Sequence, residues 1–134
     1  MAIDLGSLIP VLKELALYVG MALVAVGVFC DLVGSIGLLR FPNFFVRLHA
    51  ATVGTIGGAA YPLLGVALMA LACDFLGDIK WFIATGSFLT SIIVVLTAPA
   101  GSHALARAAH RSGVPVEPKV CDLLEEDRGG RRVA

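Results

Sequence analysis

The sequence GLLRFPNFFVRLHAAT, residues 37–52, marks an abrupt change between two long apolar segments. Pro42 has no backbone N–H and cannot continue a helix that arrives from Gly37, so the chain is expected to break there. The apolar segments on either side of this break decide which fold class the chain belongs to.

The composition indicates a membrane protein. Of the 134 residues, 58% are hydrophobic and only 15% are charged, and the mean hydropathy is +0.92. A soluble domain of this length needs more charge to cover its core. The net charge is zero, so nucleic acid is not an expected partner. The N-terminus opens with Asp4 rather than basic residues, so we expect the first apolar segment to stay in the mature protein.

Three apolar runs, at about 15–39, 52–76 and 81–98, each reach the roughly 17–25 residues that a spanning helix needs. Only helices satisfy the backbone of such runs inside lipid, because no water reaches it there. The sequence therefore predicts an all-α membrane protein, with a three-helix transmembrane domain over residues 1–116. The remainder, 117–134, is predicted to be a polar, flexible cytoplasmic tail.

Two shorter helices are predicted beside these spans. In segment 41–49 the apolar residues recur at helical spacing while the polar ones line another face, which is typical of an amphipathic helix at the membrane interface. Pro99 is expected to end the third span, and Ser102 to cap a short helix over 102–111. The residues that define these two helices are Phe41, Phe44, Phe45, Leu48, Arg40, Asn43, Arg47, His103, Arg107 and Arg111.

Small residues recur along each span and predict close helix contacts. They are Gly20, Gly27 and Gly34; Gly54, Gly58, Gly65 and Ala72; and Ser87, Thr90, Ser91 and Thr97. The three helices either pack on each other through these stripes or use them inside a larger assembly. The second interpretation is favoured, because three helices bury little surface and all three carry such a stripe.

Basic residues predict the orientation. Arg40 and Arg47 lie in the first connection, and all the other arginines follow the third span together with Lys119, whereas the N-terminal segment and the second connection hold one lysine each. A multi-pass protein with its N-terminus outside and its C-terminus in the cytoplasm is expected. Trp81 and Phe82 are typical of an interfacial aromatic belt.

The intramembrane acid Asp31 is the first candidate for a polar role in transport. A carboxylate inside a span is costly and should face protein or water, with Ser35 as the nearest candidate within the chain. Asp31 is either part of a cation or proton relay, or a hydrogen-bonded contact between helices. His49 is either a titrating group or an interfacial histidine wetted by headgroup water.

Two further features have both a functional and a structural interpretation. Asp74 and Asp78 form either an acidic mouth that attracts cations or a solvated helix end. Pro62 is expected to kink the second span, and a kink of this kind sometimes lines an ion path. Cys30, Cys73 and Cys121 have no CxxC or Cys/His spacing, so we expect free thiols, no disulfide and no metal site.

The opening stretch resembles the signature of the G-type small component of Mrp-type (also Mnh or Pha) multisubunit monovalent cation/proton antiporters. The matching residues are Gly37, Arg40, Pro42, Arg47, His49, Ala50, Ala51 and Thr52. A second match, TAPAGSHALARAAHRSGV at 97–114, includes Thr97, Pro99, His103, Ala106, Arg107 and Ala108. The resemblance covers about residues 20–116. Asn43 and Val53 depart from it, since the family usually has Asp and often Lys at these positions.

The resemblance implies a small plasma-membrane subunit that is needed for assembly and contributes to the route of Na⁺, or another monovalent cation, in exchange for H⁺. Its implied partners are large subunits resembling proton-pumping subunits of respiratory complex I, other small helical subunits, and lipids. The family-motif residues are expected to be structural or to contact subunits or lipid. No cofactor, metal or enzymatic constellation is expected. The alternatives are a subunit of an ion-translocating membrane-bound hydrogenase, a homo-oligomeric transporter and a pure assembly factor.

Overall fold

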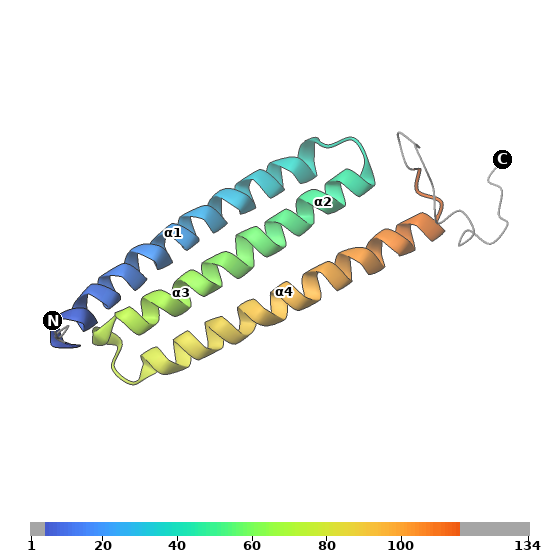
Figure 1. Cartoon of the computed structure of the whole chain (residues 1–134). Coiled ribbons are helices and arrows are strands. Elements are labelled where there is room, and N and C mark those ends of the chain that lie inside the picture. The colour runs from blue at the N-terminus through green and yellow to red at the C-terminus, as the bar shows by residue number, and fades with distance from the viewer. Residues whose placement is uncertain (1–4, 116–134) are drawn as a thin grey trace.

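The chain forms three long antiparallel helical rods in the computed structural model, which describes residues 5–115 (Figure 1). The first rod is α1, Leu5–Arg40. The second, called the middle helix below, runs without interruption through α2 (Phe44–Thr55), the π-helical turn η1 (Ile56–Ala60) and α3 (Tyr61–Ala72). A 3-10 turn, η2 (Asp74–Leu76), leads to the third rod, α4 (Ile79–Arg111).

Each of the three rods is long and apolar enough to cross a membrane. The predicted all-α fold with three spanning helices is therefore confirmed for residues 5–115. Cys30 and Cys73 are free thiols there, as expected. Cys121 and the predicted tail, 117–134, lie outside the described residues.

The chain breaks at Pro42 as predicted, since α1 ends at Arg40 and the middle helix begins at Phe44. The prediction of a separate interfacial helix over 41–49 is wrong. Nothing between 49 and 52 interrupts the backbone hydrogen bonds, so residues 44–49 become the first turns of the middle helix. The Arg47 side chain donates a hydrogen bond to the carbonyl of Phe41 and ties the connection to this first turn.

The third rod is longer than predicted, because α4 continues through Pro99 to Arg111. A proline inside a helix removes one hydrogen bond, and transmembrane helices tolerate this loss when other groups satisfy the freed backbone. The separate helix over 102–111 is thus a continuation of the third span. Ser102 is not its cap, because its hydroxyl donates to the carbonyls of Ala98 and Pro99, both at 3.0 Å.

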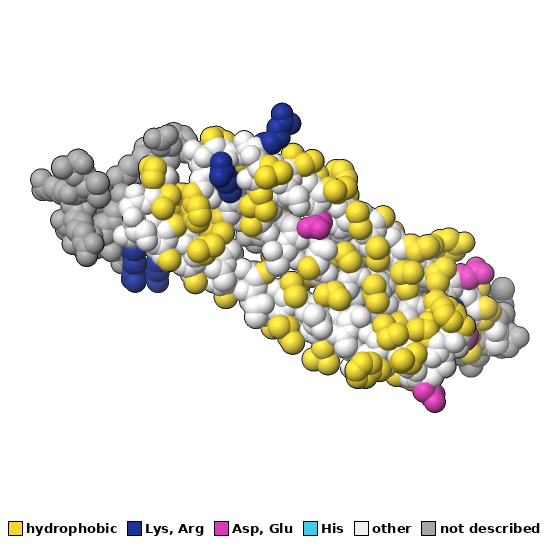
Figure 2. All heavy atoms as spheres, turned by 180° about the vertical axis from the view of Figure 1, so that it is seen from behind, with side chains coloured by type: hydrophobic (Ala, Val, Ile, Leu, Met, Phe, Trp, Pro, Cys, Tyr) yellow, Lys and Arg dark blue, Asp and Glu magenta, His cyan; other side chains and the backbone are white. Residues whose placement is uncertain are grey.

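The three rods form a single layer. Helices α1 and α4 both pack along the middle helix and make at most marginal contact with each other (Figure 1). Large apolar side chains therefore remain exposed along both outer rods, as the face in Figure 2 shows. Such a surface fits a lipid or protein environment rather than water.

Glycines bring the backbones of α1 and the middle helix into direct contact. A Cβ atom on Gly20 would lie 2.7 Å from the carbonyl oxygen of Gly65, and one on Gly65 would lie 2.5 Å from that of Gly20. A Cβ on Gly34 would lie 3.0 Å from the Cα of Gly54. The interpretation that these stripes serve a larger assembly is therefore wrong for this pair of helices, whose glycines are used inside the chain.

Helix α4 is joined to the middle helix by a buried hydrogen bond. The Ser91 hydroxyl donates to the carbonyl oxygen of Ala60 at 2.9 Å, and the two residues are 1% and 0% exposed. Ala60 is the last residue of the π-helical turn. Thr90 and Thr97, which belong to the same predicted stripe, form no such bond between helices, because their hydroxyls donate to carbonyls of α4 itself.

We expect Ser91→Ala to destabilise the detergent-purified protein by about 1 kcal/mol, because one interhelical hydrogen bond is lost and the carbonyl of Ala60 stays buried. Thermal unfolding followed by circular dichroism measures the change. Thr90→Ala is the matched control, since it removes a neighbouring hydroxyl that bonds only within α4. Equal melting temperatures for the two variants would show that the Ser91 bond adds no stability.

Candidate functional site

A polar groove lies between α1 and the middle helix, with Asp31 in its wall. The groove has a volume of about 380 Å³. Most of its other lining residues are small: Gly34, Ser35, Ala50, Ala51, Gly54, Thr55, Gly58 and Ala59. It therefore combines a carboxylate, two hydroxyls and a surface made of backbone and methyl groups.

The position of Asp31 depends on glycine. A Cβ atom on Gly58 would lie 2.8 Å from the Cβ of Asp31 and 3.0 Å from its Oδ1, and one on Gly54 would lie 3.6 Å from Oδ1. Any larger residue at Gly58 would displace the carboxylate. Asp31 is exposed in the isolated chain. Within residues 5–115 the only ion pairs join Asp74 to Lys13 and Lys80, so no cation of the described chain neutralises Asp31.

The π-helical turn Ile56–Ala60 begins directly after Thr55 and contains Gly58, so it forms part of this groove. Turns of this kind are frequent at functional sites, because they release backbone groups from the regular ladder. Pro62 follows the turn and packs its ring against Gly27. Sequence reasoning anticipated a distortion at Pro62 but missed the π-helical turn, whose signal was the Gly57-Gly58 pair close before a proline.

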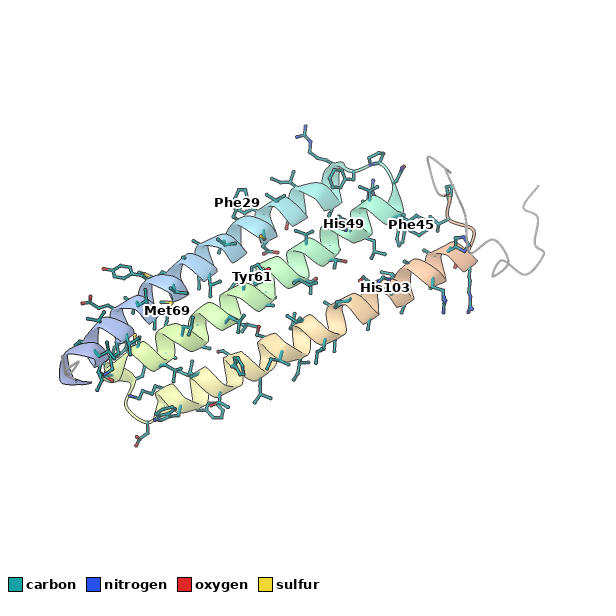
Figure 3. The ribbon with its side chains drawn as sticks, in the orientation of Figure 1. Phe29, Phe45, His49, Tyr61, Met69 and His103 are labelled. Atoms are coloured by element: carbon teal, nitrogen blue, oxygen red, sulfur yellow. The ribbon has the colours of Figure 1, made fainter. Side chains whose placement is uncertain are left out.

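The predicted polar residues separate into two groups. Ser35 lines the groove with Asp31, as expected of its nearest neighbour in the chain. His49 is exposed on α2 and does not line it (Figure 3). Thr52 donates to the carbonyl of Leu48 at 3.0 Å. Gly37 is buried, and a Cβ atom there would lie 2.8 Å from the Cβ of Ala50, which gives this motif residue a packing role.

The two sequence motifs meet at the end of the molecule that carries the arginines. Phe45 from α2 and His103 and Arg107 from α4 line one cavity of about 570 Å³. His110, which sequence reasoning missed, belongs to the same cavity and is only 5% exposed. Its signal was the spacing 103, 107 and 110, which places all three side chains on one helical face.

The opposite end carries the described acidic residues other than Asp31, and Figure 2 shows acidic side chains gathered there. Asp74 forms ion pairs with Lys13 and with Lys80, the latter at 3.3 Å. The hydrogen bond from Lys13, followed by that from Lys80, holds the pKa of Asp74 below its usual range. One of the two carboxylates in the predicted acidic mouth is therefore held by lysines, while Asp78 lies outside both ion pairs.

We expect Asp74→Asn to reduce the loss of stability in acid. A carboxyl with a lowered pKa in the folded state adds stability that is present above its unfolded pKa and is lost as the pH falls through the folded value. Melting temperatures of the wild-type protein should thus fall more steeply below about pH 4 than those of the variant. The difference is small because the ion pairs of Asp74 are exposed to water, which weakens them. Asp78→Asn is the control, and its melting temperature should depend on pH as that of the wild type does. The same dependence of melting temperature on pH in all three proteins would contradict the prediction.

Fold and groove together define a class: a small multi-pass membrane protein whose intramembrane carboxylate opens on its surface. No cluster of three potential metal ligands occurs in residues 5–115. The family model described as Na⁺/H⁺ antiporter subunit (PhaG, MnhG, YufB) matches residues 23–110. The chain belongs to this family, whose members are transporter components.

Individual relatives agree with this assignment. The G-type component of the Na⁺/H⁺ antiporter of Alkalihalophilus pseudofirmus is 39% identical over 101 residues, which cover 72% of this chain and 76% of the relative. A UPF0091 protein of Pyrococcus horikoshii is 35% identical over 113 residues, covering 83% of this chain and 93% of the relative. A UPF0091 protein of Rickettsia prowazekii is 34% identical over 92 residues, which cover 69% of this chain and 79% of the relative.

Proposed function

We propose that this chain supports a multisubunit Na⁺/H⁺ antiporter and contributes the Asp31 groove to its cation route. The observation that carries the proposal is an exposed carboxylate within a span, set against glycines and without a cationic partner in residues 5–115. Roughly 14 Å of helical rise separates Asp31 from Arg40, so the carboxylate lies inside the hydrocarbon region when Arg40 lies among headgroups.

The free-energy cost of placing a carboxylate in lipid argues against a groove that faces lipid. A carboxylate at the centre of a bilayer costs about 2.5–3.5 kcal/mol on insertion scales. The groove is therefore covered by another subunit or filled by water in the working complex. Its oxygen ligands, the Asp31 carboxylate and the hydroxyls of Ser35 and Thr55, suit a hard monovalent cation or a proton.

The surroundings of the subunit follow from its charges and from its family. The arginine end faces the cytoplasm of the cell, with the N-terminus outside the plasma membrane. Its partners are large subunits resembling those of complex I together with other small helical subunits. Transported Na⁺ (or another monovalent cation) and H⁺ are its only small ligands, and it needs no cofactor.

A tagged pull-down from native membranes in mild detergent, with every co-purifying protein identified by mass spectrometry, tests this proposal. We expect several small and two very large hydrophobic subunits and no redox proteins. Recovery with hydrogenase subunits would assign the chain to a different ion-translocating machine. Recovery as a homo-oligomer, with transport by the purified chain in liposomes, would replace the multisubunit proposal altogether.

A further inference from the structure

Two backbone carbonyls of the π-helical turn η1 point to a position that cannot donate a hydrogen bond. In an α-helix the carbonyl of Gly58 accepts from the N–H of residue 62, and in a π-helical turn the carbonyl of Gly57 accepts from that same residue. Residue 62 is a proline, which has no N–H. Gly58 therefore lacks its α-helical donor, and Gly57 lacks its π-helical one.

The contacts of the middle helix with α1 separate these two glycines. Gly57 is buried and does not line the Asp31 groove, and a Cβ atom on Gly27 would lie 3.2 Å from its carbonyl oxygen. Gly58 does line the groove, and a Cβ atom on Gly58 would lie 3.0 Å from Oδ1 of Asp31. The carbonyl of Gly58 is therefore the one that belongs to the groove.

The direction of this carbonyl brings its oxygen next to the Asp31 carboxylate. A helix carbonyl points along the axis toward the residue four positions on, which is Pro62 for Gly58. Gly58 faces Asp31, and Pro62 faces Gly27, which lies one turn before Asp31 on the same side of α1. The oxygen therefore lies between these two contacts, on the side of the middle helix that faces the carboxylate.

Hydroxyl oxygens complete the polar surface of the groove. Ser35 lies one turn after Asp31 on the same side of α1. Thr55 donates its hydroxyl hydrogen to the carbonyl of Ala51 at 2.9 Å, so the lone pairs of its oxygen remain available to the groove. No Lys, Arg or His is among the described residues that line the groove. A cation is the ligand that suits a carboxylate, a carbonyl and hydroxyl oxygens together.

We propose that the backbone carbonyl of Gly58 and the hydroxyl of Ser35 bind, together with the Asp31 carboxylate, one partly dehydrated monovalent cation. This inference rests on the function proposed above and adds the ligands and the charge of the ion. Irregular helix backbone coordinates cations in membrane transporters because its carbonyls replace the water that the ion gives up.

The charge of the ion follows from the depth of the site. Tyr61, which directly follows the π-helical turn, lies about midway along the middle helix (Figure 3). One positive charge neutralises the carboxylate of Asp31, since the carbonyl and hydroxyl ligands are neutral. A divalent ion would leave a net positive charge within the hydrocarbon region, where an unpaired charge is costly.

Equilibrium binding of radioactive Na⁺ to the purified complex tests the carbonyl ligand. Pro62→Ala introduces an N–H at position 62, which donates to the carbonyl of Gly58 and withdraws it from the cation. We expect the affinity for Na⁺ to fall roughly tenfold, as for the loss of one contact to a charged group. The matched control is the same variant with an ester oxygen in place of the amide nitrogen of residue 62. It has the same methyl side chain but no N–H, so it should bind Na⁺ nearly as tightly as the wild type.

A second variant tests the site without changing the backbone. Ser35→Ala removes the hydroxyl ligand and should also weaken Na⁺ binding, whereas Thr90→Ala, whose hydroxyl bonds within α4, should not. Equal affinities for Na⁺ in these two variants would exclude the Ser35 hydroxyl as a ligand and overturn the ligand set proposed here.

The remaining outcomes separate this inference from the function on which it rests. Equal Na⁺ affinities for Pro62→Ala and its ester form would overturn the carbonyl ligand, while a loss of binding in Asp31→Asn would leave the proposed function standing. Unchanged Na⁺ binding in Asp31→Asn would overturn both. Displacement of Na⁺ by Ca²⁺ at equal concentration would overturn the assignment to a monovalent ion, and so would a wild-type complex that binds no Na⁺.

Discussion

Asp31→Asn is expected to lower Na⁺-dependent proton exchange by the assembled antiporter about tenfold, the effect of removing some 1.4 kcal/mol of stabilisation from the transport barrier. The amide keeps the size and hydrogen-bonding shape of the side chain and removes only its charge and its proton. The amount of assembled complex should stay unchanged, because Asp31 is exposed in the isolated chain and forms no ion pair within residues 5–115. Exchange is measured in everted membrane vesicles with a pH-sensitive dye.

Two variants give this prediction its controls. Asp31→Glu retains the carboxylate and should preserve part of the exchange, and Asp78→Asn removes an acid outside the groove and should preserve all of it. Unchanged exchange in Asp31→Asn would remove the carboxylate from the cation route. A loss of the complex itself would make Asp31 an assembly contact instead, and immunoblots of the other subunits distinguish the two results.

Gly27→Ala is expected to be the most destabilising small substitution in the chain. The added Cβ would lie 2.1 Å from Cγ and 2.3 Å from Cδ of Pro62, and a proline ring has little freedom to move away. Helix α1 must then separate from the middle helix, at a cost of about 3 kcal/mol, the upper part of the usual range for overpacking. Melting temperature in detergent and the yield of folded protein report this loss.

The same chemical change at Gly86 is the matched control, because a Cβ atom there would meet nothing within 4 Å. Gly86→Ala should be neutral or slightly stabilising, since alanine is the better helix former. Pro62→Ala removes the two ring atoms and should recover much of the stability of Gly27→Ala. If Gly27→Ala and Gly86→Ala have the same melting temperature, the close contact between Gly27 and Pro62 does not contribute to the packing of α1 on the middle helix.

The spans and the break at Pro42 were predictable, because each depends on local sequence alone: a long apolar run makes a helix, and a proline after it ends one. The same rule fails at Pro99. Membrane helices tolerate a proline inside them when other groups satisfy the freed backbone, and α4 continues through Pro99 and Ser102 to Arg111. The local sequence does not distinguish these two prolines.

The candidate site was only half predictable. Asp31 and Ser35 stood out because a polar pair within an apolar run is rare, and they lie on one helix at fixed spacing. Gly58 opposite Asp31, Ala60 opposite Ser91 and Phe45 opposite His103 depend on how antiparallel helices are aligned. That alignment is set by contacts between backbones, which a single sequence does not display.

The arrangement of the rods in a single layer has an electrical consequence. A layer one helix thick is only about 10–12 Å across, so its two broad faces are separated by little more than the diameter of the middle helix. Protein of low polarity screens charge far less than water does. An ion bound on one broad face of the layer therefore changes the electrostatic potential at the other face, without any movement of the chain.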